Sequence, residues 1–141
     1  MGNGIGFQIM YEAVNQTTST TTSSTTTTTN IKYKDCGGNF TAPHGFITSP
    51  LYPENYPNNA ECTYVITQPT GKYVNLTIVY MDLQYEEDWM TGWVFCPDNL
   101  SIRDGESQSS ESLAGYICGN ETVTSINETS IISSNNNVRL R

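Results

Sequence analysis

Basic residues are scarce in this chain of 141 residues: Lys and Arg together number 6, against 14 Asp and Glu, and the formal net charge is −8. A protein that binds nucleic acid needs a basic face that displaces counterions from the phosphates. The chain has too few basic residues to supply such a face. We therefore expect no nucleic-acid partner.

Histidine and catalytic motifs are also scarce. His44 is the only imidazole, and the sequence contains no G-x-S-x-G, no H-E-x-x-H and no glycine-rich phosphate loop. A hydrolase needs a nucleophile with a base, or a metal with an open position. Three consecutive acids, Glu86, Glu87 and Asp88, are adjacent carboxylates, but acids on a loop are usually solvated charge. We expect no catalytic residues and no enzyme activity.

Long apolar runs are absent. No segment approaches the roughly 20 apolar residues of a membrane span, and residues 1–10 lack the basic start and apolar stretch of a signal peptide. We expect neither a membrane span nor a signal peptide in this segment.

Four cysteines are present, Cys36, Cys62, Cys96 and Cys118. They allow three disulfide pairings, and their spacing alone does not choose among them. A zinc site is the competing use of four cysteines. It is disfavoured because the chain has no C-x-x-C spacing and a single histidine.

Glycosylation motifs are frequent for so short a chain. Six asparagines each begin an N-x-[ST] triplet without proline in the middle: Asn15, Asn39, Asn75, Asn99, Asn120 and Asn127. Such a number predicts a glycosylated surface and an extracellular or secreted location.

The first quarter of the chain divides into two parts. Residues 1–14 contain one alternating strand, with Phe7, Ile9 and Tyr11 on the same face. Thr17–Thr29 is an unbroken run of Thr and Ser with no apolar side chain to offset the entropy of ordering. The sequence therefore predicts a disordered linker over residues 15–35.

The most specific stretch is Gly45–Tyr64, which reads GFITSPLYPENYPNNAECTY. Its two Tyr-Pro steps and its asparagines predict a rigid looping connection between two strands. Together with Cys36-Gly37-Gly38 upstream, this pattern resembles the opening of a CUB domain. The resemblance implies an all-β fold, a jelly-roll-like two-sheet sandwich over residues 36–141. It also implies the sequential disulfides Cys36–Cys62 and Cys96–Cys118.

The resemblance also leads us to expect that the last strands of the domain, which would follow residue 141, are missing from this segment. Phe7–Tyr11 looks like the closing strand of an upstream CUB-like domain, and a start methionine followed by a loose terminus is the alternative interpretation. An open sandwich edge recruits strands. We therefore predict Gly6–Glu12 as an edge strand of this sandwich, in the same chain or in a swapped dimer. A disordered tail is the competing prediction.

Strand registers inside the sandwich follow from alternation. Leu100 and Ile102 are predicted to face inward. In Lys72–Asp82 the predicted inward residues are Val74, Leu76, Ile78 and Tyr80, which leaves Asn75 and Thr77 outside.

Calcium is the one ion that the resemblance brings into question, since many CUB domains hold it with carboxylates from separate loops. Carried over by position, Asp98 matches one aspartate, whereas Gln84 stands where the family has glutamate and His44 where it has tyrosine. The last aspartate would lie beyond Arg141. We expect no cofactor and no tight calcium from this degenerate site.

The loop Tyr85–Phe95 contains three acids and two tryptophans and is longer than the connection that the resemblance implies. Glu86, Glu87, Asp88, Trp89 and Trp93 are the candidate binding residues, because tryptophan is enriched at interface hot spots. The alternative is that both tryptophans cover the rim of the sandwich.

The predicted function is a non-catalytic extracellular recognition module that binds a protein or glycan partner through loops at one end of the sandwich. The alternative is a glycosylated spacer, or an accessory domain of a secreted protease or a lectin-bearing protein. A spacer has no reason to expose its tryptophans, so their exposure separates the two.

Overall fold

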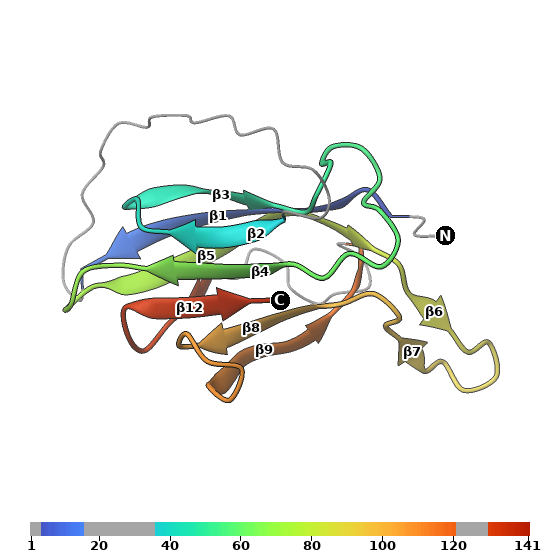
Figure 1. Ribbon diagram of the computed structural model, residues 1–141. Coiled ribbons are helices and arrows are strands. Elements are labelled where there is room, and N and C mark those ends of the chain that lie inside the picture. Colours follow the sequence, from blue (N-terminus) through green and yellow to red (C-terminus); the bar gives the residue numbers. More distant parts are fainter. Residues whose placement is uncertain (1–3, 16–35, 121–129) are drawn as a thin grey trace.

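A computed structural model describes residues 4–15, 36–120 and 130–141, all of which form strands and loops (Figure 1). The Thr/Ser run and the predicted glycosylation site Asn127 lie outside the described residues. No helix within these ranges is long and apolar enough to cross a membrane. The all-β prediction is confirmed.

Two five-stranded sheets form the sandwich. Sheet A has the order β10-β5-β1-β3, with β11 also paired to β5. Its strands are β1 (Gly6–Val14), β3 (His44–Thr48), β5 (Tyr73–Leu83), β10 (Gly119–Asn120) and β11 (Ser130–Ile132). Sheet B has the order β2-β4-β12-β8-β9. Its strands are β2 (Gly37–Phe40), β4 (Thr63–Thr67), β12 (Asn137–Leu140), β8 (Leu100–Asp104) and β9 (Glu111–Ile117). A separate hairpin consists of β6 (Glu86–Glu87) and β7 (Val94–Phe95).

The core lies between the two sheets because alternate residues of each strand point inward. Leu100 and Ile102 of β8 are buried, as predicted, and Val138 and Leu140 of the adjacent β12 are buried beside them. The structure joins Cys36 to Cys62 and Cys96 to Cys118, which is the sequential pairing implied by the resemblance.

The predicted register of β5 is right in its first half and wrong in its second. Val74 and Leu76 are fully buried, but the next buried positions are Met81 and Leu83. The cause is a β-bulge: Gln8 of β1 pairs with Tyr80 and Ile9 pairs with Ile78, which leaves Val79 as the extra residue. One extra residue reverses the alternation, so Tyr80 points outward and Ile78 is only partly buried.

Strand β1 lies inside sheet A and not at its edge. It pairs antiparallel with β3 on one side and with β5 on the other (Figure 1). Phe7, Ile9 and Tyr11 face the core, and Ile9 is 0% exposed. The prediction that this segment joins the sandwich is confirmed, whereas the predicted edge position is wrong. The reason is topological: β3 and β5 are not paired with each other, and β1 fills the space between them.

Close backbone contact holds the start of β1 in register. The Ser49 Oγ accepts a hydrogen bond from the Phe7 N–H (3.0 Å), and the Phe7 carbonyl accepts one from the Ser49 N–H (3.1 Å). Gly6 has φ of +108°, and a Cβ added there would collide with the Ser49 Oγ. Only glycine fits this position.

Candidate functional site

The hairpin β6–β7 extends away from the sandwich at the end opposite the turn between β4 and β5 (Figure 1). Glu86 pairs with Phe95 and Glu87 with Val94. The tip is closed by hydrogen bonds from the Asp88 N–H to the Trp93 carbonyl (2.9 Å) and from the Gly92 N–H to the Asp88 carbonyl (2.7 Å). These local bonds give the projecting segment a defined shape although it has no core of its own.

Asp88 organises the turn at the hairpin tip. Its Oδ1 accepts hydrogen bonds from the Met90 N–H (2.8 Å) and the Thr91 N–H (3.3 Å). These two bonds favour the ionised carboxylate and lower the pKa of Asp88 below its ordinary value. Asp88 is therefore a turn former as well as an exposed negative charge.

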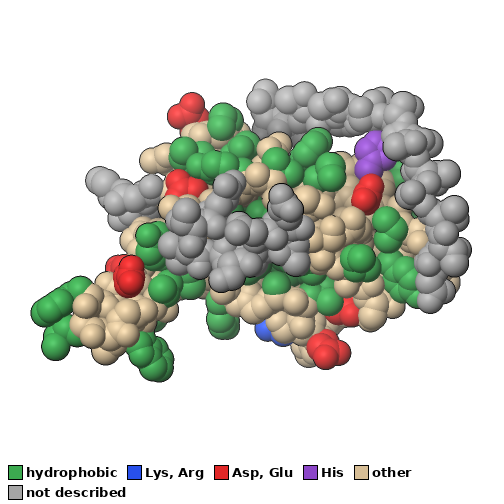
Figure 2. Space-filling model, turned by 180° about the vertical axis from the view of Figure 1, so that it is seen from behind, with side chains coloured by type: hydrophobic (Ala, Val, Ile, Leu, Met, Phe, Trp, Pro, Cys, Tyr) green, Lys and Arg blue, Asp and Glu red, His purple; other side chains and the backbone are tan. Residues whose placement is uncertain are grey.

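Large apolar side chains cover the hairpin. Trp89 is 88% exposed, Trp93 78%, Met90 75% and Phe95 66%. Figure 2 shows hydrophobic side chains on both sides of the lobe that projects at the lower left. The tryptophans do not cover the sandwich rim, so that alternative is wrong. Exposed apolar clusters of this kind mark interaction sites in soluble proteins.

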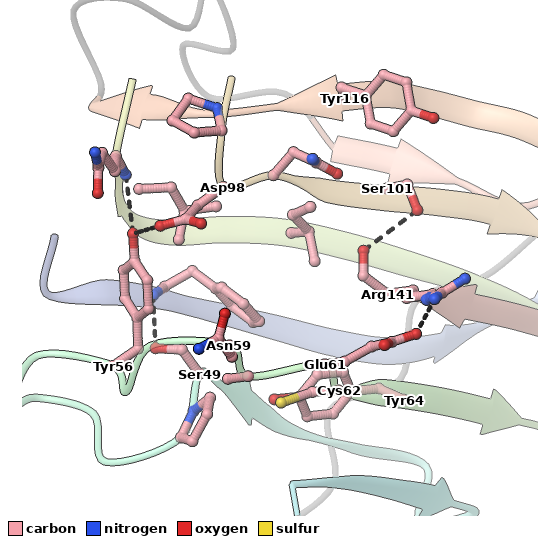
Figure 3. A pocket seen from close by; sticks show the side chains of 18 of the residues that line it. Ser49, Tyr56, Asn59, Glu61, Cys62, Tyr64, Asp98, Ser101, Tyr116 and Arg141 are labelled. Atoms are coloured by element: carbon pink, nitrogen blue, oxygen red, sulfur yellow. Dashed lines mark hydrogen bonds and ion pairs between the residues drawn. The ribbon is translucent and has the colours of Figure 1, made fainter. Parts of the chain in front are cut away.

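Tyr56 forms a hydrogen-bonded centre near the root of the hairpin (Figure 3). Its hydroxyl donates to the Asp98 Oδ2 (2.6 Å) and accepts from the Gln84 N–H (3.0 Å). The contact ties the loop after β3 to the residues that enter and leave the hairpin. Sequence reasoning did not select Tyr56, although the Tyr56-Pro57 step marked it as a rigid position.

Burial raises the pKa of Tyr56 to about 12, and its hydrogen bond to Asp98 and the negative charges of Asp98 and Asp82 add to the effect. The neutral phenol is therefore favoured in the folded protein. A tyrosine with an ordinary pKa of 10.0 in the unfolded chain contributes this stability fully below pH 10 and loses it as the pH rises through 12.

Replacing Tyr56 with phenylalanine is expected to reduce the free energy of unfolding by about 1–3 kcal/mol at neutral pH, because the Gln84 N–H and the Asp98 carboxylate lose their partner. Burial also raises the pKa of Tyr11 and Tyr64, so the natural chain and the Tyr56→Phe variant both lose stability at alkaline pH. Urea unfolding between pH 10 and 12 should show a shallower loss for Tyr56→Phe than for the natural chain. Equal slopes would contradict the role assigned to Tyr56.

The three residues of the predicted calcium site do not come together. Gln84 and Asp98 meet at the Tyr56 hydroxyl, but His44 pairs with Glu12. Gly6, which pairs with Asp82 near Gln84, lies at the other end of β1, about 20 Å from Glu12 at the usual rise per residue. The assignment of His44 to the calcium site is therefore wrong. A position matched in the sequence does not show at which end of the sandwich the residue lies.

These residues do not fit a calcium ion well. Asp98 is engaged by Tyr56, and Gln84 offers only a neutral amide oxygen. Within residues 4–15, 36–120 and 130–141, no group of three or more His, Cys, Asp and Glu side chains is placed to hold a metal. That this chain holds no tight calcium remains a prediction.

The described glycosylation motifs differ in access. Asn15, Asn39, Asn99 and Asn120 are exposed. Asn75 is half-buried within sheet A, and its Nδ2 donates to the Glu12 Oε1 (3.0 Å). The outward direction of Asn75 agrees with the predicted register, but its nitrogen is already engaged. Glycosylation at all these positions remains a prediction.

Comparison with known proteins agrees with this architecture. The CUB domain profile matches residues 36–141. Neuropilin-1 of Rattus norvegicus is 35% identical over 133 residues, which are 94% of this chain and 12% of that protein. Cubilin of Canis lupus familiaris is 40% identical over 91 residues, 64% of this chain and 2% of that protein. Tolloid-like protein 2 of Mus musculus is 37% identical over 86 residues, 61% of this chain and 8% of that protein.

The chain thus spans 12% or less of the length of these relatives. The match to the rat protein reaches beyond the profile: residues 36–141 number 106, so at least 27 matched residues (133 − 106) precede Cys36. The profile itself covers 106 of 141 residues, and both the sandwich and the two disulfides agree with it. This chain therefore belongs to the CUB domain family.

Proposed function

We propose that this chain is a non-catalytic extracellular recognition module that binds a protein partner through the hairpin β6–β7. The observation that carries the proposal is the exposure of Trp89 and Trp93 on a structured projection. Tryptophan buries a large area at low entropic cost and is enriched among hot-spot residues. CUB domains are generally non-catalytic modules, which agrees with this function.

A protein partner is favoured over a glycan by the chemistry beside the tryptophans. Met90, Val94 and Phe95 add aliphatic and aromatic surface without hydrogen-bonding groups, which suits an apolar pocket. Glu86 and Glu87 are exposed at the base of the hairpin, so basic side chains around that pocket would complement it. A spacer domain would have no use for this surface.

The extracellular location is supported by the two disulfides and by the exposed N-x-[ST] asparagines. We further propose that residues 15–35 are a linker and that residues 1–14 serve as a closing strand. The match to rat neuropilin-1 ahead of Cys36 supports a shared arrangement there. In this chain β1 pairs within the sandwich of residues 36–141. That the same strand closes an upstream domain is a proposal that rests on its sequence pattern.

The test is the double substitution Trp89→Ala and Trp93→Ala in an Fc fusion of the full chain, applied to an array of purified extracellular ectodomains. Two hot-spot truncations should weaken binding about a hundredfold or more, while the melting temperature stays within a few degrees because neither ring packs on the core. Phe46→Ala is the matched control, since Phe46 is an exposed aromatic residue on β3, away from the hairpin. Ectodomain binding that survives the double substitution, or is lost equally with Phe46→Ala, would contradict the proposal.

A further inference from the structure

The arginines of this acidic chain are gathered on one surface. The chain has three, Arg103, Arg139 and Arg141, which are half of its Lys and Arg residues. Arg103 of β8 and Arg139 of β12 are direct partners across adjacent strands, and Arg141 follows Arg139 by two residues. All three side chains leave the outer face of sheet B, because Ile102, Val138 and Leu140 fill the inner face. We call Arg103, Arg139 and Arg141 the arginine face.

The arginine face borders a pocket of about 920 Å³ that extends toward the Tyr56 end of the sandwich (Figure 3). Ser101 and Tyr116 also line it, and Tyr116 is 75% exposed. The pocket therefore offers fixed cations, a hydroxyl and an aromatic surface to a ligand that enters from solvent.

Within the described residues, two of these cations have no counter-charge. Arg103 Nη1 donates to the Ser110 carbonyl (3.1 Å), and Arg139 Nη1 makes a long bond to the Glu106 carbonyl (3.4 Å). Among the described residues, no carboxylate lies within ion-pairing distance of either guanidinium. Like charges directly opposite each other on neighbouring strands destabilise a sheet. Folding alone does not explain why Arg103 faces Arg139.

The nearby acids are turned to other partners. Asp104, next to Arg103 in sequence, accepts hydrogen bonds from the Ser134 N–H (3.1 Å) and the Asn135 side-chain amide (3.1 Å). With the Asn137 side-chain amide turned so that its nitrogen faces Glu106, that nitrogen lies 3.3 Å from the Glu106 Oε1 and can donate to it. The guanidinium groups of Arg103 and Arg139 thus keep most of their donors for a group from outside.

The third arginine shows which group this surface accepts. The Arg141 Nη2 forms an ion pair with the Glu61 Oε1 at the side of the pocket (Figure 3). The planar guanidinium presents paired donors that match the two oxygens of a carboxylate. The Glu61 carboxylate is therefore already held on the arginine face, whereas Arg103 and Arg139 have no carboxylate partner among the described residues.

We propose that Arg103 and Arg139 form a binding site for the carboxylates of an acidic segment of a partner protein, with Tyr116 as its aromatic wall. A short segment fits better than a long sulfated polysaccharide. The chain as a whole is acidic, with a net charge of −8, and would repel a polyanion that continued past the three arginines. This site is distinct from the hairpin β6–β7 and does not depend on the function proposed for it.

The test uses the full chain with Asn99→Gln, because Asn99 lines the same pocket and begins a glycosylation motif. The probe is a capped synthetic peptide, Gly-Asp-Glu-Glu-Asp-Gly, at about 0.15 M salt to screen long-range attraction. The neutral peptide Gly-Asn-Gln-Gln-Asn-Gly and a heparin-derived tetrasaccharide are the comparison ligands. Titration calorimetry gives the affinity, and NMR of the arginine Nε–H groups identifies the residues that respond.

The acidic peptide should bind saturably and shift the Nε–H signals of Arg103 and Arg139. Arg103→Gln and Arg139→Gln should each weaken it about tenfold. Lys72→Gln is the control, because it removes the same charge from the turn before β5, where Lys72 bonds to Asn15. This substitution should change the affinity by less than about twofold. The melting temperature of Arg139→Gln should equal or exceed that of the parent, since a repulsive pair is removed.

Several outcomes would overturn the proposal. They are the absence of saturable binding at millimolar peptide, equal loss of affinity in Lys72→Gln, and Nε–H shifts confined to Arg141. Equal binding of the neutral peptide, or tighter binding of the tetrasaccharide than of the acidic peptide, would also exclude an acidic protein segment as the ligand.

Discussion

Replacing Ile9 with aspartate is expected to unfold the sandwich. Ile9 is 0% exposed in the middle of β1, with β3 and β5 paired on either side. A carboxylate there would lose its hydration without gaining a partner, at a cost of several kcal/mol. Since a domain of this kind is stable by roughly 5–15 kcal/mol in total, circular dichroism and urea titration should find little or no cooperative unfolding transition.

Gln8→Asp is the matched control, because Gln8 lies in the same strand on the opposite face of the sheet. It introduces the same charge where water can reach it, and its melting temperature should stay within a few degrees of the parent. If Ile9→Asp melted like Gln8→Asp, β1 would not be part of the sandwich in solution, and residues 1–14 would be a tail.

The second large effect is expected from Cys96→Ser combined with Cys118→Ser. The disulfide closes a loop with a sequence separation of 22, and its loss should cost about 3 kcal/mol by the chain-entropy estimate. Cys118 is 4% exposed, so a serine hydroxyl there adds a desolvation cost. Because Cys96 directly follows β7, the hairpin should also lose its fixed direction, and hairpin-dependent binding should weaken with stability.

Cys36→Ser combined with Cys62→Ser separates these two effects. That disulfide has a similar sequence separation of 26, so its removal should cost a similar free energy of unfolding. It lies at β2 and the start of β4, not at the hairpin. Urea unfolding and ectodomain binding measured on both variants should show comparable losses of stability but a loss of binding only for the Cys96 pair. Equal loss of binding would disprove a specific link between Cys96–Cys118 and the hairpin.

Local pattern predicted most of the sandwich and failed where a single residue interrupts it. Alternation placed Val74, Leu76, Leu100 and Ile102 correctly because burial on one face of a strand imposes period two. It failed after Ile78 because nothing in the sequence marks Val79 as a bulge. The alternation of apolar residues in β1 was equally clear from the sequence. Its place between β3 and β5, however, depends on strands that are far away in the sequence.

The candidate site was less predictable than the fold. Both tryptophans were selected from their residue type, yet an apolar ring suits a core and an interface equally well, so exposure had to come from the structure. Tyr56 was missed because its role requires Asp98 and Gln84 to approach from distant loops. The arginine face was missed for the same reason, since Arg103 and Arg139 become neighbours only when β8 pairs with β12.

The central position of β1 also has a consequence during synthesis on the ribosome. β1 ends at Val14, but β5, which flanks it along its whole length, ends at Leu83, so 69 residues (83 − 14) must be added before that ladder can close. At about 5–20 residues per second this takes roughly 3–14 s. Until β5 is made, β1 can pair only with β3, and its apolar residues Phe7, Ile9 and Tyr11 would suit a chaperone that holds extended apolar segments. The nascent protein therefore depends on β1 being kept available until β5 has been made.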